Sequence, residues 1–270
     1  MKIILFGSTG MLGRYVLSVL YKNYQVISFL RDDYDIKNDS NLKLENLLSI
    51  LQKNDVVINC SGLIPQNNSN NIDSLRDYIK INSIFPNTLN EICSKLNCKF
   101  IHITTDCVFS GLKGDYDEND IHDSNTYYGI SKSLGENETS TIIRTSIIGE
   151  ELYNKNSLLE WLKKNKNKTI NGYTNHFWNG VTCLTLAKII KNIIDNNLYW
   201  KGVRHIYSPD SVNKYDLCNY INEIYNLNIK IEKIEKEYKN LTLTSVYDKL
   251  FDIDTIYNQI IEQYEHNIKL

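Results

Sequence analysis

The chain has 270 residues, of which 42% are hydrophobic and 23% are charged, and its formal net charge is -2. This is the composition of an ordinary globular protein with enough chain to bury a core. The small negative charge gives no support for binding nucleic acid or an anionic membrane surface. The 6 cysteines form no C-x-x-C pair, so we expect no structural metal site.

No targeting or membrane-spanning segment is expected. The apolar start, Ile3–Phe6, is too short for a signal peptide, and no apolar run reaches membrane-spanning length. We therefore expect a cytoplasmic protein with reduced thiols and no membrane partner. Whether it forms a homodimer is left open.

Short apolar strands alternate with amphipathic helices over the first 150 residues. Strands are predicted at Lys2–Phe6, Gln25–Leu30, Asp55–Cys60, Lys99–Thr104 and Thr141–Thr145, and helices at Met11–Tyr21, Leu42–Leu51, Ser74–Leu96 and Thr126–Asn137. Pro86 is expected to make the third helix irregular, and Gln66–Asn71 is expected to be a loop. The alternation implies an α/β fold: a Rossmann-type, doubly wound parallel sheet with a ligand crevice at the carboxyl ends of its strands.

The pattern changes after about residue 150. Helices are predicted at Ser157–Lys164, Val181–Ile194 and Lys214–Tyr225, and a strand at Gly202–Tyr207. We predict that residues 1–150 form a dinucleotide-binding domain, to which the chain returns around 181–208. Residues 151–180 and 209–270 are predicted to form a smaller, mixed substrate-binding domain that caps the crevice.

A glycine-rich turn follows the first strand. The stretch Gly7-Ser8-Thr9-Gly10-Met11-Leu12-Gly13 has G-x-x-G-x-x-G spacing between a strand and a helix. Gly7 permits the tight turn, Gly10 lets the backbone approach a pyrophosphate, and Gly13 lets the helix pack closely on the strand. Thr9, Met11 and Leu12 belong to the same predicted site, because a helix N-terminus offers free N–H groups to phosphates. The alternative is a glycine-rich turn without a ligand.

The end of the second strand bears on the choice of cofactor. It reads Phe29-Leu30-Arg31-Asp32-Asp33. An arginine there can accommodate the extra phosphate of NADP, whereas an acidic residue binds the ribose hydroxyls of NAD. Arg31 comes first and favours NADPH, and the two aspartates leave NADH open. A solvated charged turn is the alternative.

Tyr128 and Lys132 are four residues apart, so on a helix they lie on one face. A phenol titrates near 10 in water, and a neighbouring ammonium is expected to lower that pKa. The pair would then form a general acid for reducing a ketone. Thr105 ends the preceding strand and could donate a hydrogen bond to the same ketone, or it could be a turn or cap hydroxyl.

The order of these motifs resembles the extended short-chain dehydrogenase/reductase superfamily, and within it the dTDP-4-dehydrorhamnose reductase-like sugar-nucleotide reductases. The resemblance rests on the glycine turn, Asn59-Cys60-Ser61-Gly62, Thr104–Phe109, Tyr128 with Lys132, and Ile143-Arg144-Thr145-Ser146. It covers the first 150 residues well and the rest loosely. The chain departs from that branch at Gly62-Leu63-Ile64-Pro65 and at Leu241–Ser245, which lacks an R-P-x-x-S pattern.

The resemblance implies a nicotinamide cofactor, a nucleotide-linked 4-keto-6-deoxy sugar as substrate and a set of roles. Thr105 would polarise the ketone, Tyr128 would give the proton, and Lys132 would tune it and hold the nicotinamide ribose. Asn82 matches a position that supports a water relay behind the lysine. The segment Asn59-Cys60-Ser61-Gly62 would line the cofactor site.

Candidate substrate contacts lie at the strand ends and in the stretch Asn175–Thr182, which combines planar and amide side chains. A nucleotide base could stack on Trp178, Asn179 could read its edge, and His176 could contact phosphate. The alternative is an ordinary aromatic loop with a structural histidine. Asp106 and Arg144 complete the predicted substrate site, although Arg144 could instead pair with a nearby carboxylate.

The leading hypothesis is therefore an NAD(P)H-dependent reductase of a nucleotide-linked 4-keto-6-deoxy sugar, acting in deoxysugar or glycan precursor biosynthesis. A sugar-nucleotide epimerase or bifunctional epimerase-reductase is an alternative with different net cofactor consumption. A non-catalytic, dinucleotide-binding regulatory subunit is an alternative from another class. The presence of both Tyr128 and Lys132 argues against it.

Overall fold

The computed structural model describes residues 1–65, 72–153 and 155–268, so the predicted loop Gln66–Asn71 lies outside the described residues. The largest sheet has six parallel strands in the order β10-β5-β4-β3-β1-β2. These strands are β1 (Lys2–Phe6), β2 (Gln25–Phe29), β3 (Val56–Asn59), β4 (Lys99–Thr105), β5 (Thr141–Thr145) and β10 (Gly202–His205). The winding reverses between β1 and β3, which confirms the predicted doubly wound fold.

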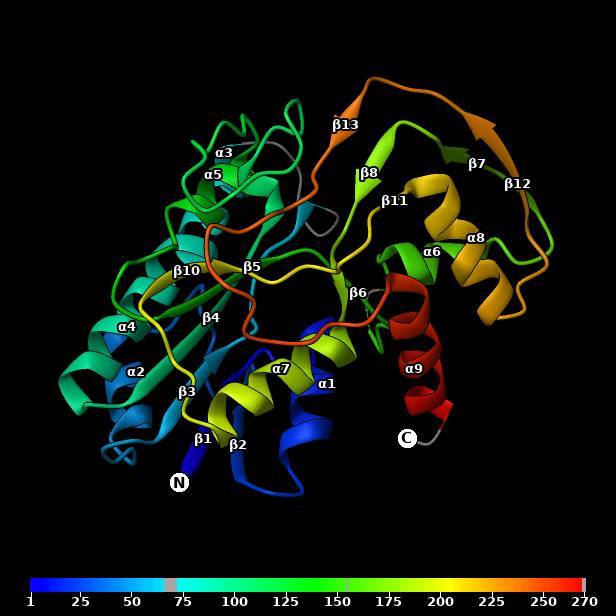
Figure 1. Ribbon diagram of the computed structural model, residues 1–270. Coiled ribbons are helices and arrows are strands. Elements are labelled where there is room, and N and C mark those ends of the chain that lie inside the picture. The colour runs from blue at the N-terminus through cyan, green and yellow to red at the C-terminus, as the bar shows by residue number, and fades with distance from the viewer. Residues whose placement is uncertain (66–71, 154, 269–270) are drawn as a thin grey trace.

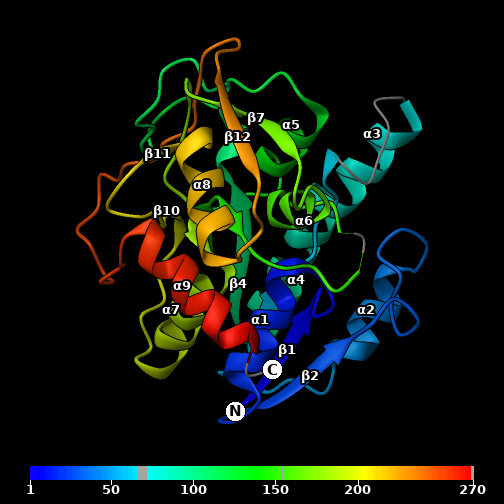
Figure 2. The same ribbon diagram turned by 90° about the vertical axis from the view of Figure 1, so that its right-hand side faces the viewer.

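Helices cover both faces of this sheet (Figures 1 and 2). The helices are α1 (Met11–Leu20), α2 (Asn41–Leu48), α3 (Ile72–Tyr78), α4 (Phe85–Leu96), α5 (Tyr127–Ser133), α6 (Leu158–Lys164), α7 (Cys183–Asp195), α8 (Lys214–Ile224) and α9 (Ile256–Ile268). Ile3 and Leu5 of β1 bury into the core shared with α1 and α7. Ile4 and Phe6 bury into the core shared with α2 and α4. Because alternate side chains of a strand point to opposite faces, a continuously apolar strand requires helices on both.

The remaining strands form small sheets beside the large one. These are β6 (Ile147–Ile148) with β9 (Val181–Thr182), β7 (Thr169–Tyr173) with β12 (Lys230–Ile234), and β8 (His176–Trp178) between β11 (Val212–Asn213) and β13 (Lys239–Asn240). Leu159, Trp178, Leu217 and Ile260 belong to their apolar core, together with residues of α6, α8 and α9. Figure 1 shows these elements gathered on one side of the large sheet.

The chain passes between the two groups of elements more than once. After β9 it forms α7, which packs against α1, and then β10, which pairs with β5. A long irregular segment, 241–255, later runs from β13 past β10 to α9 (Figure 1). Phe251 and Ile253 of this segment pack onto the core of the large sheet. The domain boundaries given above stay a prediction.

Most predicted elements are present with small shifts at their ends, but two differ in kind. The predicted helix Ser74–Leu96 is interrupted by a π-helical turn, η2 (Ile79–Ile84), and Pro86 sits in the first turn of α4, where its missing N–H costs nothing. Val181 and Thr182 form β9 rather than helix, and the Thr182 hydroxyl caps α7. The short strands of the small sheets and α9 were not predicted.

Candidate active site

The three glycines of the first turn have different surroundings. Gly7 has a φ of +78°, and a Cβ there would lie 2.7 Å from the Ser61 nitrogen. A Cβ on Gly13 would lie 2.0 Å from the Gly7 carbonyl oxygen, so α1 packs directly on the turn. A Cβ on Gly10 would meet only the Gly7 oxygen, at 3.2 Å. Gly7 and Gly13 therefore hold the turn together, whereas Gly10 borders open space.

A cleft of about 550 Å³ opens at this turn, within the size range of small-molecule sites. The turn residues Gly7–Gly10, Thr9 among them, line one wall, and Cys60–Leu63 after β3 line another. Gly10 begins α1 without a side-chain cap, which leaves N–H groups of the first turn, including those of Met11 and Leu12, for an anion. This cradle fits the diphosphate of a dinucleotide.

Arg31, at the end of β2, lines the same cleft. The Asp33 carboxylate accepts a hydrogen bond from the Leu30 nitrogen at 2.8 Å, so it serves its own turn. The arginine is thus the side chain at this strand end that faces the cleft with its charge available to a ligand.

The turn after β3 joins the cleft to α5. Asn59 is buried, and its Oδ1 accepts a hydrogen bond from the Ser61 nitrogen at 3.0 Å. A Cβ on Gly62 would lie 2.9 Å from Lys132 Nζ, so the ammonium lies directly beside this turn. Burial raises the pKa of Cys60 to about 12, which makes it a neutral thiol in the cleft wall.

Lys132 is buried, and its Nζ donates to the Ile103 carbonyl at 3.3 Å. Burial lowers the pKa of Lys132 to about 8, opposed by Glu136 and Cys60. The ammonium therefore stays protonated near neutral pH, although less firmly than an exposed lysine.

Asn82 lies buried in η2, with its amide engaged on both sides. Its Oδ1 accepts from the Leu63 nitrogen at 2.9 Å, and its Nδ2 donates to the Leu63 carbonyl at 3.0 Å and to Ser131 Oγ at 3.1 Å. Asn82 thereby ties the turn after β3 to α5. A water relay through this residue stays a prediction.

Tyr128 is partly exposed and contacts the Thr105 hydroxyl. Burial raises its pKa, Cys107 and Asp106 act in the same direction, and the hydrogen bond with Thr105 lowers it. The prediction that a neighbouring ammonium lowers the pKa of Tyr128 is therefore wrong in direction. The physical reason is that desolvation of the phenolate dominates, while the Lys132 ammonium is held at the Ile103 carbonyl.

Thr105 is a cap hydroxyl, as one of the two interpretations held, and its hydrogen bond to a ketone stays a prediction. Its Oγ1 accepts from the Cys107 nitrogen at 3.2 Å and so caps the 3-10 turn η3 (Asp106–Val108). The same hydroxyl donates to Asp106 Oδ1 at 3.0 Å and lies beside Tyr128. Asp106 is buried, and this burial raises its pKa.

Arg144 does not belong to a substrate site. Its side chain is 2% exposed, and it forms an ion pair with Glu136 at 2.6 Å. Its remaining nitrogens reach His205 Nε2 at 2.8 Å and His122 Nε2 at 2.6 Å. The predicted substrate contact is wrong, because every guanidinium nitrogen is already committed to a buried network, as the alternative interpretation held.

His176, Trp178 and Asn179 also make contacts within the fold. Trp178 is 5% exposed in the core of the small sheets. The Asn179 amide donates to the Leu243 carbonyl at 2.8 Å and accepts from the Leu243 nitrogen at 2.9 Å. His176 Nε2 contacts the Glu237 carbonyl at 2.8 Å. Trp178 and Asn179 are thus engaged within the fold, which favours the alternative interpretation, and a phosphate contact by the partly exposed His176 stays a prediction.

The sequence analysis missed one charged residue of this region. The Lys214 ammonium, in the first turn of α8, lies 5.6 Å from the Trp178 ring centroid. Lys214 and Asp106 interact electrostatically, although they are far apart in the chain. The sequence did contain a signal for Lys214, because it follows the cap residue Asn213. A lysine is unfavourable at a helix N-terminus, which already carries a partial positive charge.

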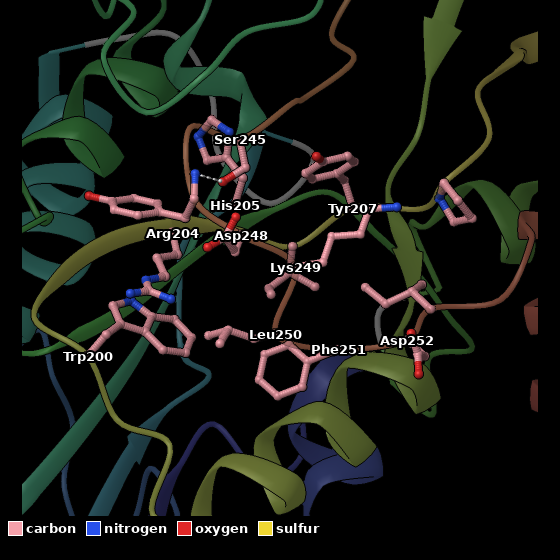
Figure 3. Close-up of a pocket in the computed structure, with 14 residues that line it drawn as sticks. Trp200, Arg204, His205, Tyr207, Ser245, Asp248, Lys249, Leu250, Phe251 and Asp252 are labelled. Atoms are coloured by element: carbon pink, nitrogen blue, oxygen red, sulfur yellow. Dashed lines mark hydrogen bonds between the residues drawn. The ribbon is translucent and has the colours of Figure 1, made fainter.

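A second hollow, of about 140 Å³, lies between β10 and residues 245–253 (Figure 3). Within it, the Arg204 guanidinium lies 5.4 Å from the Trp200 ring centroid and 4.5 Å from that of Tyr247. None of the residues predicted for the cofactor or the substrate lines this hollow.

Among the described residues, no group of three His, Cys, Asp or Glu side chains is arranged to hold a metal ion. None of the helices in the described ranges is both long and apolar enough to cross a membrane.

Two sequence comparisons agree with this geometry. The model of the family described as RmlD substrate binding domain matches residues 1–243. A curated dTDP-4-dehydrorhamnose reductase from Mycolicibacterium smegmatis is 26% identical over 138 residues, which are 50% of this chain and 40% of that relative. The match thus spans less than half of the relative's length.

Solved structures extend the similarity over the whole chain. A dTDP-4-dehydrorhamnose reductase from Clostridium acetobutylicum superposes with a TM-score of 0.79 at 22% identity, covering 100% of both chains. The corresponding protein of Bacillus anthracis, in complex with NADP, gives 0.81 at 18% identity and covers 98% of this chain and 99% of its own. A GDP-L-fucose synthetase from Naegleria fowleri bound to NADP gives 0.74 at 14% identity, with 99% and 93% covered. At these identities the similarity establishes a shared fold.

Proposed function

The chain belongs to the family described as RmlD substrate binding domain, and from this premise we propose that it is an NAD(P)H-dependent reductase of a nucleotide-linked 4-keto-6-deoxy sugar. One observation carries the proposal. Lys132 lies beside Gly62 in the wall of the dinucleotide-sized cleft, and Tyr128 on the same helix contacts Thr105. Tyr128 would be the proton donor and Thr105 the hydrogen-bond donor to one ketone oxygen, beside a cofactor held in the cleft.

The cofactor would be held by the glycine turn and the turn after β3. The N–H groups at the start of α1 would bind its diphosphate, and the Lys132 ammonium would bind its nicotinamide ribose. Arg31 would pair with the additional phosphate of NADP, which is why we propose NADPH as the preferred form. A bound nicotinamide cofactor supplies a hydride for the ketone carbon.

The remaining chemistry belongs to the side chains. The Tyr128 phenol, whose pKa burial raises, is protonated at neutral pH and would donate that proton to the ketone oxygen. Thr105 would donate a hydrogen bond to the same oxygen and so stabilise the charge that develops there. The ketone becomes an alcohol, and the phenolate left on Tyr128 is reprotonated from solvent.

The test follows NADPH consumption with a panel of dTDP- and UDP-linked 4-keto sugars. Tyr128→Phe should fold and bind NADPH while turnover falls by about 10²–10⁴-fold, the usual contribution of positioned proton transfer. Tyr127→Phe makes the same change one residue earlier on α5 and should retain activity. Near-parental reduction by Tyr128→Phe would overturn the mechanism.

Two further outcomes identify the alternatives. A parent protein that binds NADPH tightly but reduces none of the sugars would favour the regulatory subunit. Conversion of a sugar without net NADPH consumption would favour an epimerase.

Arg31→Ala should weaken NADPH binding more than NADH binding, and an equal loss would contradict the proposed cofactor preference.

A further inference from the structure

Positive charge collects on the small-sheet side of the Tyr128 region. The Lys214 ammonium lies over the Trp178 ring, which fixes it at the start of α8 beside β8. Lys239, on β13, reaches across to the loop after β4: its Cγ would lie 2.8 Å from a Cβ on Gly111. Both lysines interact electrostatically with Cys107, which adjoins Asp106.

This arrangement is electrostatically unfavourable for the free protein. The two lysines repel each other, and the start of a helix already carries a partial positive charge. Burial lowers the pKa of Lys214, and only Asp106, Cys218 and Cys107 oppose that effect. No carboxylate of the described chain forms an ion pair with Lys214. A partly buried cation of this kind would be stabilised by an anion.

Lys214, Cys107 and Tyr128 each keep part of their surface exposed. Asp106 follows Thr105 directly in the chain, and the two lysines belong to α8 and β13, which are small-sheet elements. The glycine turn, where the dinucleotide would bind, instead follows β1 of the large sheet.

We propose that Lys214, with Lys239 beside it, binds the diphosphate of the nucleotide-linked substrate. This inference rests on the proposed function, because it assigns the substrate's charged group to the same site. The diphosphate would place its two negative charges between two ammonium groups, with the sugar directed toward Tyr128. Lys214 is the main contributor, because its aromatic support holds the ammonium in place, whereas Lys239 is exposed.

The experiment measures binding without turnover, by calorimetry with dTDP and with thymidine. Lys214→Met should raise the Kd for dTDP about tenfold or more and leave that for thymidine unchanged, since one charge-assisted contact is lost. Lys214→Arg should keep most of the dTDP affinity. Lys233→Met is the matched control, because Lys233 also lies over a ring, that of Tyr215, at 4.9 Å.

Unfolding and NADPH binding provide the check on a merely structural role. Lys214→Met should unfold at nearly the parent's temperature, because the charge that it removes is costly to bury and Asp106 offsets only part of that cost, and it should bind NADPH as the parent does. An unchanged dTDP affinity, or an equal loss for thymidine, would overturn the proposal. A parent that binds dTDP but reduces no keto sugar would overturn the function and keep this site. If the parent reduces the sugar and Lys214→Met binds dTDP as tightly as the parent does, the proposed function would stand and this site would be overturned.

Discussion

At the scale of single residues, burial acts in opposite directions on the pKa values of Tyr128 and Lys132, which both lie on α5. It disfavours the charged form of each group, so it raises the pKa of Tyr128 and lowers that of Lys132 to about 8. Near neutral pH both groups are therefore protonated, Tyr128 as a neutral phenol and Lys132 as an ammonium. This is the protonation state that ketone reduction requires.

Lys132 should leave a signature in the pH dependence of stability. Its folded pKa of about 8 lies below the ordinary value of 10.5. Between these values the unfolded chain binds more protons than the folded one, so this residue makes stability rise with pH. The full rise is on the order of 3 kcal/mol.

Urea unfolding of the parent and of Lys132→Met, from pH 7 to pH 10, measures this effect. The parent should gain stability relative to the variant across the window, whereas below about pH 8 the difference should be constant. Lys201→Met, at an exposed position, is the control and should follow the parent. Parallel curves for the parent and Lys132→Met would contradict the assignment.

At the scale of elements, different glycines of the first turn serve the packing of the fold and the binding of the cofactor. Gly13 packs α1 on the backbone of the turn, and Gly10 borders the cleft. Gly13→Ala would place a methyl group 2.0 Å from the Gly7 oxygen, so backbone must shift. We expect a loss of about 1–3 kcal/mol in unfolding free energy, as for other overpacked sites.

Gly10→Ala is the matched change in the same turn. Its Cβ would contact only the Gly7 oxygen, at 3.2 Å, and its φ of -75° suits any residue. This variant should therefore fold nearly normally and bind NADPH more weakly. Chemical denaturation and NADPH titration of both variants test the division, and equal effects of the two changes on both measurements would show that it is not real.

At the scale of the whole molecule, buried polar contacts join the two groups of elements. Asn179 holds Leu243 by both backbone groups, and His205 of β10 contacts the Thr244 carbonyl at 2.7 Å. Asp115, in the loop after β4, donates its backbone N–H to Thr242 Oγ1 at 2.9 Å. These contacts fix residues 241–245 against the large sheet, next to the proposed substrate site.

Asn179→Ala should be strongly destabilising. It leaves the Leu243 N–H and carbonyl buried without partners, at a cost of about 2–5 kcal/mol for the two groups. Asn175 makes the same pair of hydrogen bonds to the backbone of Lys236, but those bonds are exposed to solvent. Asn175→Ala should therefore cost much less, because water replaces the lost bonds. Urea unfolding of both variants, with hydrogen exchange of residues 241–245, measures the contrast; similar losses would refute this account.

The sequence by itself determined the doubly wound sheet and the cofactor turn. Both depend on local patterns: apolar strands that alternate with amphipathic helices, and glycines at positions where a side chain would meet backbone. Tyr128 and Lys132 were equally accessible to prediction, because residues four apart on a helix share a face. Their protonation was not, since the pKa of Tyr128 follows from burial by distant segments.

Only the tertiary structure decided which polar side chains remain available to a substrate. Arg144, Trp178 and Asn179 are residue types that suit a binding site, yet each is used by a contact with a distant part of the chain. The partner of Asn179 lies 64 residues later, and that of Arg144 on β10 lies 61 residues later. Lys214, which local patterns did not single out, interacts with Asp106 because the fold brings the start of α8 near the residues that follow β4. No local pattern encodes such pairings, because burial of a group depends on which segments the whole fold brings together.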